Sequence, residues 1–477
     1  MAKAFISGVN GFIGSHLAQV LLERGDEVVG LVRTTSDTRS LAPLFERYGH
    51  RFRIVVGDLR DPQTLGAGLE DVEYVFHLAA VLLGISEAEF VETNVDGTKN
   101  LLEAVMRHRT ARLKRFVFTS SLAAAGPSPD DSPINETRPP APVSWYGKSK
   151  VEGERIVMQY ASQGLPVTIG RPVAVYGERE RDLSGGTFPI VKLGVKPMIG
   201  FKRKKLSMVY VGDLVAGLVA AAESNATVGK TYFFSNQTAY RDTEVVAAAA
   251  DAMGKRIRIP VITPQFLLPI VGLFAETLHR FTRARPVLTR DKAREVQQRW
   301  WVASAQAADT DFGWTAHVSL AEGMKRAVTE WKERRARRRL VREPIGDRAV
   351  KTYLIALGFG IVVEGIASIG QWYEFDPWWL IFVVIVAVFG VVLGSISLFF
   401  ARSPAVVQFV LGAIVGVGAE LLNHFWLHTW EFAPAFLARL PSDPWMLALA
   451  LGLPAGLMPV LVNAIVQTLY SLRLRLG

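Results

Sequence analysis

The chain has 477 residues, half of them hydrophobic, and a formal net charge of +10. It contains no cysteine, which excludes disulfide bonds, thiolate metal sites and a cysteine nucleophile. The positive charge is concentrated, since residues 332–351, KERRARRRLVREPIGDRAVK, hold nine Lys or Arg and three acidic residues. Up to about Trp331 the sequence alternates apolar and charged segments, as a globular domain does, whereas long apolar stretches dominate after Thr352.

The first predicted elements are a strand, a turn, a helix and a second strand, over KAFISGVNGFIGSHLAQVLLERGDEVVGLVR. Three glycines give the turn the spacing G-x-x-G-x-x-G. A pyrophosphate binds against backbone N–H groups at the start of a helix, where a side chain would block its approach. In this strand–turn–helix context the glycines predict a dinucleotide site. We assign to it Gly8, Gly11, Phe12, Ile13 and Gly14.

The next three predicted strands supply further cofactor contacts. The second strand ends at Arg33, where a site that selects NAD places an acidic residue on the ribose 2′-hydroxyl. A cation suits the 2′-phosphate of NADP, so we expect NADP in preference to NAD. The segment VVGDLRD follows a third strand and places Asp58, with Leu59 beside it, within reach of the adenine. The fourth strand, YVFHLAA, ends in Ala79 and Ala80, whose small side chains let the cofactor lie close.

A fifth predicted strand, RFVFTSSLAAAGPS, ends in two serines, and YGKSK follows it with Tyr146 and Lys150. Positions i and i+4 share one face of a helix, so we expect the Lys150 ammonium to lower the pKa of Tyr146. Tyr146 would then act as a general base near neutral pH, while a serine hydroxyl holds the substrate oxygen. This set predicts hydride transfer between a carbinol carbon and a nicotinamide, with Lys150 also holding the ribose.

Together these motifs resemble the extended short-chain dehydrogenase/reductase superfamily. The matching pieces are GVNGFIG, GDL, HLAA, ETNVDGTKNLLEA with Asn94, TSS, YGKSK and RPVAVYG, and they cover residues 1–331. The resemblance implies an α/β fold, a Rossmann-type doubly wound parallel sheet with a small substrate subdomain from about residue 172. It also implies that Ser121 is the catalytic serine, with Ser120 as the alternative. Asn94, Arg171 and Pro172 would adjoin the cofactor.

Two features favour the branch of 3β-hydroxysteroid dehydrogenases and sterol-4-carboxylate decarboxylases. TSSLAAAGPS is similar to the serine strand of that group, and PVITPQFLLPIVGLFAETLHRF followed by RPVLTRDK resembles its apolar helix and Pro-x-Leu-Thr element. By its own composition, 265–281 is a helix with little polar surface. Three roles stay open for it: core packing, an oligomer interface such as that of a homodimer, or a lip that dips into a membrane surface.

Four apolar segments follow, each long enough to cross the roughly 30 Å hydrocarbon core of a bilayer. They predict a four-helix transmembrane domain in residues 352–477, with helices near 352–371, 379–400, 405–427 and 445–470. Lys and Arg dominate alternate connections, which predicts a multi-pass protein with its catalytic domain and both termini in the cytosol. We recognise no family for this half and assign no metal site. Four polar side chains inside the segments leave a metal or proton role and a polar seam open: Glu364, Glu420, His424 and His428.

The basic stretch 332–351 is then interpreted as a juxtamembrane linker. It adjoins the first predicted span, and its charge would contact anionic head groups. It lacks the interleaved aromatic residues on which nucleic-acid bases stack. We therefore expect membrane contact and no nucleic-acid partner.

The sequence thus favours a membrane-anchored NAD(P)-dependent oxidoreductase that acts on a lipid-soluble hydroxy or keto substrate, in first place a 3β-hydroxysterol. If the substrate carries a 4-carboxylate, oxidation gives a β-keto acid, which readily loses carbon dioxide, so decarboxylation at C4 belongs to the same expectation. One alternative is a nucleotide-sugar epimerase or dehydratase whose diphosphate binds FKRKK, residues 201–205. The other is a non-catalytic membrane sensor that binds the dinucleotide.

Overall fold

The structure, a computed structural model, describes residues 1–180, 186–200, 202–257, 259–282, 286 and 288–340. The chain divides into two units, residues 1–334 and 335–477. Within the described ranges, no helix is both long enough and apolar enough to cross a bilayer. The four predicted spans and their polar residues lie outside the described residues, so they stay predictions.

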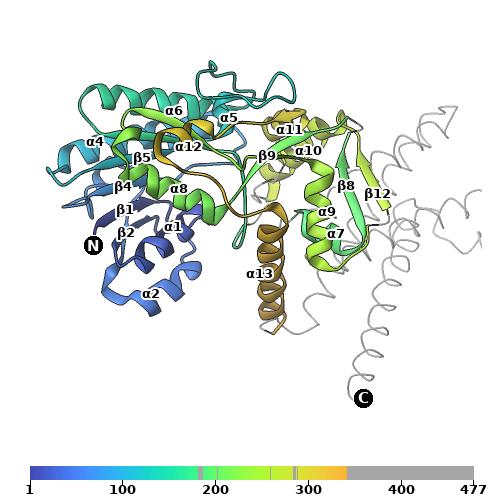
Figure 1. The fold of residues 1–477 in the computed structure, drawn as a ribbon, viewed down its shortest axis with the longest axis horizontal. Helices are drawn as coiled ribbons and strands as arrows, with labels where there is room; N and C mark the ends of the chain where they lie inside the picture. Colours follow the sequence, from blue (N-terminus) through green and yellow to red (C-terminus); the bar gives the residue numbers. More distant parts are fainter. Residues whose placement is uncertain (181–185, 201, 258, 283–285, 287, 341–477) are drawn as a thin grey trace, which may run out of the picture. The chain divides into compact units, whose positions relative to one another are not determined.

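A seven-stranded sheet, parallel throughout, forms the centre of the first unit (Figure 1). Its strand order is β10–β6–β5–β4–β1–β2–β3, so the order reverses at β1, between β2 and β4. The carboxyl ends of strands at such a reversal form the crevice in which doubly wound folds bind ligands. The strands are β1 (Lys3–Ser7), β2 (Glu27–Val32), β3 (Phe52–Val56), β4 (Tyr74–His77), β5 (Arg115–Thr119), β6 (Val167–Pro172) and β10 (Lys230–Phe234). The predicted Rossmann-type sheet is confirmed.

Helices cover both faces of this sheet, because successive side chains of its buried strands point to opposite sides. On β1, Ala4 and Ile6 join one apolar core and Phe5 joins the other. The first core contains residues of α1 (Phe12–Glu23) and α8 (Val211–Glu223), and the second contains residues of α4 (Gly97–His108) and α6 (Trp145–Ser162). Shorter helices complete this half: α2 (Ala42–Tyr48), α3 (Glu87–Phe90), α5 (Leu122–Ala125) and α12 (Gln306–Phe312).

Two smaller sheets form the other half of the first unit. In one, β9 (Lys205–Tyr210) pairs with β7 (Ala174–Tyr176), β11 (Ala239–Arg241) and β13 (Trp300–Trp301). In the other, β8 (Val195–Ile199) pairs with β12 (Ile259–Thr263). The helices here are α7 (Phe188–Lys192), α9 (Asp242–Met253), α10 (Leu267–Thr282) and α11 (Arg290–Gln297). The subdomain expected from about residue 172 is therefore interrupted, because α8 and β10 return to the large sheet.

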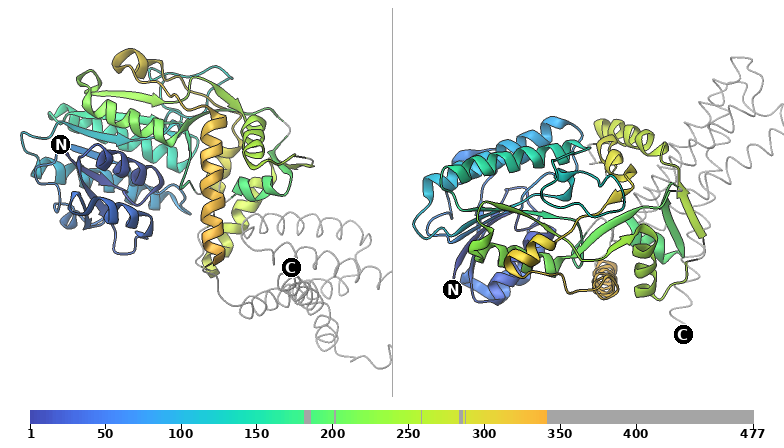
Figure 2. Two further views of the ribbon diagram at one scale, coloured as in Figure 1. Left: turned by 60° about the horizontal axis from the view of Figure 1, so that its bottom comes forward. Right: turned by 45° about the horizontal axis from the view of Figure 1, so that its top comes forward.

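The last described helix, α13 (Leu320–Leu340), stands between the large sheet and the smaller ones (Figure 2). Its Trp331 ring packs edge-on against Phe188, with the ring centres 5.7 Å apart. Gly323 lies so close to Tyr176 that a Cβ there would be 2.8 Å from the phenol ring. The helix runs without interruption into the basic stretch, so residues 332–340, expected to begin a linker, are helical.

Candidate functional site

The glycine-rich turn connects β1 to α1 at the carboxyl edge of the large sheet. Gly8 has φ +77, and a Cβ there would lie 2.8 Å from the backbone nitrogen of Ala79. A Cβ on Gly14 would lie 2.2 Å from the carbonyl oxygen of Gly8, so both glycines are required by close backbone packing. Gly11 caps α1 without any side-chain hydrogen bond. The N–H groups of the first helical turn, at Phe12 and Ile13, are therefore open to an anion, which fits a dinucleotide pyrophosphate.

A buried hydrogen-bonded chain fixes the ends of β1 and β4 beside this turn. Ser7 Oγ lies 2.6 Å from His77 Nδ1, His77 Nε2 lies 2.9 Å from Thr98 Oγ1, and Thr98 donates to the Asn94 carbonyl at 2.6 Å. Because Thr98 uses its own proton on Asn94, His77 donates from Nε2 and accepts from Ser7 at Nδ1. Burial, and next the Lys150 charge, lower the His77 pKa to about 3, so the ring stays neutral. The sequence did not predict this series of hydrogen bonds.

Asn94 connects that chain to the segment after β4. Its amide accepts from the Val81 N–H at 2.7 Å and donates to the Val81 carbonyl at 3.0 Å and to Ser149 Oγ at 2.9 Å. The Asn94 side chain thus bonds to Val81 and to Ser149. Asn94 therefore ties the end of Ala79–Ala80–Val81 to α6, and its expected contact with the cofactor stays a prediction.

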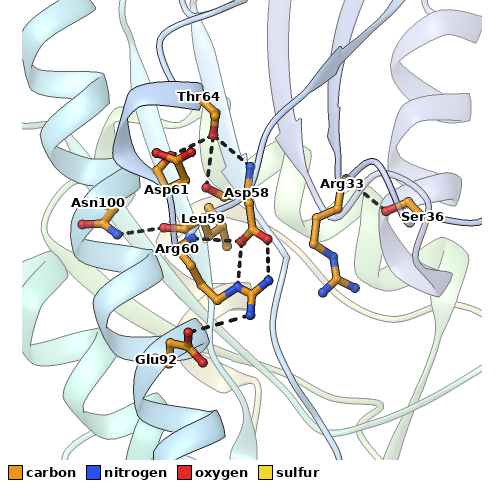
Figure 3. Close-up of polar contacts among 9 residues, drawn as sticks. All are labelled: Arg33, Ser36, Asp58, Leu59, Arg60, Asp61, Thr64, Glu92 and Asn100. Carbon is orange, nitrogen blue, oxygen red and sulfur yellow. Dashed lines mark hydrogen bonds and ion pairs between the residues drawn. The ribbon is translucent and has the colours of Figure 1, made fainter.

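The residues expected at the adenosine end lie together beyond β2 and β3 (Figure 3). The Asp58 carboxylate accepts two hydrogen bonds from the Arg60 guanidinium, at 3.1 and 2.7 Å, and this pairing lowers the pKa of Asp58. The Arg33 guanidinium makes no hydrogen bond or ion pair with any described residue, but its charge helps to lower the pKa of Asp58. Leu59 is buried, and its carbonyl accepts from Asn100 at 2.8 Å. This end thus presents one cation, Arg33, without a hydrogen-bonded partner among the described residues, and one cation, Arg60, paired with Asp58.

The three expected catalytic residues meet where β5 ends and α6 begins. Tyr146 and Lys150 lie one turn apart on α6. Ser121 lies close enough to the Tyr146 phenol to lower its pKa, and Ser121 also caps α5 by accepting from the Ala123 N–H at 3.1 Å. Ser120 is buried, and its hydroxyl donates to Glu154 at 2.5 Å. Of the two serines, Ser121 is thus the one that faces Tyr146.

The charges around Tyr146 differ from our expectation. Burial raises its pKa, the Glu295 carboxylate raises it further, and the nearby Ser121 hydroxyl opposes them. The Lys150 amine donates to the Thr119 carbonyl at 2.8 Å, and burial lowers its pKa to about 8. In this state desolvation therefore outweighs any help from Lys150, and a phenolate at Tyr146 is disfavoured. An oxidised nicotinamide would bring a positive charge that favours the phenolate.

A buried ion pair between Arg171 and Glu154 lies next to the catalytic residues. Arg171 at the end of β6 donates to both oxygens of Glu154 on α6, at 2.8 and 2.6 Å. Glu154 also accepts from Ser120, and its charge raises the Lys150 pKa against the effect of burial. Pro172, expected beside the nicotinamide, is the last residue of β6 and is buried. The pair thus fixes both the serine turn and the helix that carries Lys150.

Two acids of α11 hold the start of α6, and sequence reasoning missed both. Ser144 caps α6 by accepting from the Gly147 N–H at 3.0 Å, and its hydroxyl donates to Glu295. Asp291 accepts from the Trp145 N–H at 2.8 Å. Both carboxyl side chains are buried. The turn that precedes Tyr146 is therefore set by a helix about 145 residues further along the chain.

Comparisons with known proteins agree with this site. A profile described as the NAD dependent epimerase/dehydratase family matches residues 4–233. A 2-alkyl-3-oxoalkanoate reductase of Shewanella oneidensis is 26% identical over 347 residues, covering 68% of this chain and 85% of that protein. A 3-beta-hydroxysteroid dehydrogenase of Mycolicibacterium neoaurum is 28% identical over 273 residues, covering 54% of this chain and 72% of that protein.

Two further similarities concern sugar nucleotides. MoeE5, solved in complex with UDP-glucose and NAD, matches with a TM-score of 0.55 at 25% identity, covering 70% of this chain and 99% of that one. A UDP-N-acetyl-alpha-D-glucosaminuronate decarboxylase of Bacillus cytotoxicus is 30% identical over 239 residues, covering 46% of this chain and 71% of that protein. With the dinucleotide turn and the serine, tyrosine and lysine in place, the chain belongs to the NAD dependent epimerase/dehydratase family.

Proposed function

We propose that the chain is an oxidoreductase that interconverts a secondary alcohol and a ketone on a lipid-soluble substrate, with NADP or NAD. The observation that carries this proposal is the meeting of Ser121, Tyr146 and Lys150 at the end of β5. The glycine-rich turn lies at the same edge of the sheet, and no side chain there caps the N-terminus of α1. Ser121 would orient the substrate oxygen, and the Tyr146 hydroxyl would exchange its proton. Lys150 would hold the ribose and keep positive charge beneath the phenol. The bound nicotinamide would supply hydride chemistry.

The substrate we propose in first place is a 3β-hydroxysterol, with loss of carbon dioxide where the sterol carries a 4-carboxylate. The similarity to a 3-beta-hydroxysteroid dehydrogenase supports it. The name of the oxoalkanoate reductase supports a related chemistry, because a 3-oxo acid with a 2-alkyl branch is also a β-keto acid on an apolar skeleton. A 4-carboxysterol and a 2-alkyl-3-oxo acid both have an oxygen β to a carboxylate, whereas a plain 3β-hydroxysterol shares with them the secondary alcohol or ketone on an apolar skeleton.

We propose NADP as the preferred cofactor because the Arg33 guanidinium has no hydrogen-bonded partner among the described residues and lies near Asp58, at the expected adenosine end. Arg33→Ala should weaken NADPH binding about tenfold, the effect of losing one charge-assisted contact. NADH binding should change little, since it lacks the 2′-phosphate. Binding titrations with both nucleotides measure this directly. Equal losses for NADPH and NADH would contradict the assignment.

A nucleotide-sugar epimerase or dehydratase is the second candidate, favoured by the similarity to MoeE5 and by the cations of residues 202–205. Cofactor use separates the two. A dehydrogenase converts one NAD(P) per substrate, whereas an epimerase restores its cofactor in every turnover. The purified chain should form NAD(P)H from a 3β-hydroxysterol, or consume NADPH with a 2-alkyl-3-oxo acid, and Tyr146→Phe should abolish both reactions. Turnover of a UDP-sugar without net NAD(P)H change, and none of the lipids, would overturn the proposal.

We also propose that the enzyme works at a membrane, with its catalytic unit and both termini in the cytosol. The apolar segments after residue 352 and the charge bias of their connections support this. Protease treatment of sealed, right-side-out vesicles should leave residues 1–340 intact, and only permeabilised vesicles should lose them. Digestion in sealed vesicles would reverse the orientation.

A further inference from the structure

The smaller half carries exposed apolar side chains over one short stretch of chain. On β12, Ile259 is 57% exposed and Val261 49% exposed, and these two residues share one face of the strand. Phe266, between β12 and α10, is 69% exposed. On α10, Ile270 and Leu273 are 51% and 50% exposed, and Phe274 beside them is also exposed. Six large apolar side chains exposed within residues 259–274 indicate a partner.

Helix α10 has two distinct faces. Leu268, Val271 and Gly272 are buried at helical spacing, and a Cβ on Gly272 would lie 2.7 Å from the Arg290 nitrogen of α11. The exposed positions 270, 273 and 274 occupy the other face, at the same i, i+3, i+4 spacing. The inner face thus explains how α10 packs, and the outer face has no explanation within the described residues.

The charge around these apolar residues is one-sided. The sequence has no Asp or Glu between Asp251 and Glu276, and none between Asp182 and Asp213. These two segments contain nine Lys or Arg, including Lys255 and Arg256 just before β12. Exposed apolar side chains, with the exposed cations Lys255 and Arg256 just before them and no acid from 252 to 275, match an anionic bilayer surface, where apolar groups enter the acyl region and cations meet phosphates.

We propose that β12, Phe266 and the outer face of α10 form a lipid-contacting surface that rests on a membrane leaflet rich in anionic lipid. The long apolar segments after residue 352 are an independent reason for a bilayer to be close to this unit. The surface is a property of the smaller half, and it holds whichever substrate the catalytic site takes. A lipid-soluble substrate would enter from the leaflet on which this surface rests.

Because the chain has no cysteine, single cysteines can be labelled without background. The full chain would carry a polarity-sensitive NBD label at Phe266→Cys or Leu273→Cys, and at Val228→Cys as the matched control, since Val228 is 46% exposed in a turn before β10. Each protein is reconstituted into phosphatidylcholine vesicles with and without phosphatidylglycerol. Acyl-chain nitroxide lipids should quench positions 266 and 273 about threefold more than position 228, and iodide should quench them less. Phosphatidylglycerol should increase the difference.

Two results would overturn the proposal. Quenching by iodide at 266 and 273 as at 228 would show a water-exposed face. Protection from both iodide and nitroxide lipid would show that another protein segment covers it, such as residues 341–477 or a second copy. The combined variant Lys255→Glu and Arg256→Glu, with its fold checked by circular dichroism, should remove the effect of phosphatidylglycerol. An undiminished effect would refute the role given to the cations.

Discussion

Replacing Lys150 with Met should stabilise the folded chain at neutral pH while it abolishes catalysis. Burial lowers the Lys150 pKa from 10.5 to about 8. At about 1.4 kcal/mol per pKa unit, holding this ammonium in the folded state at pH 7 costs about 3 kcal/mol. Met has a similar shape and carries no charge, but it loses the hydrogen bond to the Thr119 carbonyl, which is worth about 1 kcal/mol. The expected net gain is about 2 kcal/mol at pH 7.

The sign of the pH dependence follows from the lowered pKa. Between pH 8 and 10.5 the unfolded chain keeps a proton that folded Lys150 has released, so the wild type gains stability as the pH rises. The advantage of Lys150→Met should therefore shrink and nearly vanish by about pH 10.

Guanidinium unfolding of the full-length wild type and variant, at pH 7 and pH 10 and constant ionic strength, measures this difference. Lys148→Met is the matched control, because Lys148 is exposed on the same helix and should show no such pattern. The reasoning would be refuted if the variant were less stable than the wild type at pH 7. It would also be refuted if the difference in free energy of unfolding were the same at pH 7 and pH 10.

Three further changes test the supports of the site. Gly14→Ala should destabilise the fold by about 1–3 kcal/mol and abolish dinucleotide binding, because its Cβ meets the Gly8 carbonyl at 2.2 Å; thermal unfolding and NADPH titration report both. Ser144→Ala should cost about 1 kcal/mol in thermal unfolding, since it removes the cap of α6. Glu295→Gln should move to lower pH the limb of the pH–rate profile that Tyr146 sets, the basic limb when ketone reduction is assayed, because the Glu295 charge raises the Tyr146 pKa; an unmoved limb would argue against that coupling.

The parts of the fold that the sequence predicts well are those set by local rules. The glycine spacing sits at a strand-to-helix turn, and only glycine fits where Gly8 and Gly14 pack against backbone. The i, i+4 spacing of Tyr146 and Lys150 holds on any helix, and α6 supplies that helix. The apolar pattern of 265–281 likewise became α10 within one or two residues.

What the sequence could not predict depends on contacts between distant segments. Burial decides the pKa of Tyr146, and no local pattern shows that Glu295 would add a negative charge beside it. His77 looked like a strand residue in YVFHLAA, yet its ring joins two elements in a buried chain. The partner of Asp58 was two residues away, in GDLRD, and a local reading of alternating charge could have found Arg60.

Contacts between α10 and α11, and between α11 and the start of α6, connect the helix that carries the outer apolar face to Tyr146. Glu276 of α10 accepts from the Arg290 N–H at 2.7 Å and from its guanidinium at 2.8 Å, which fixes the first turn of α11. The next residue, Asp291, holds the Trp145 N–H directly before Tyr146. Since Gly272 leaves no free space between the two helices, α10 cannot shift without moving α11. If the proposed surface rests on lipid, it would act on the same helix that fixes the start of α6, and the position of the tyrosine would respond to that contact.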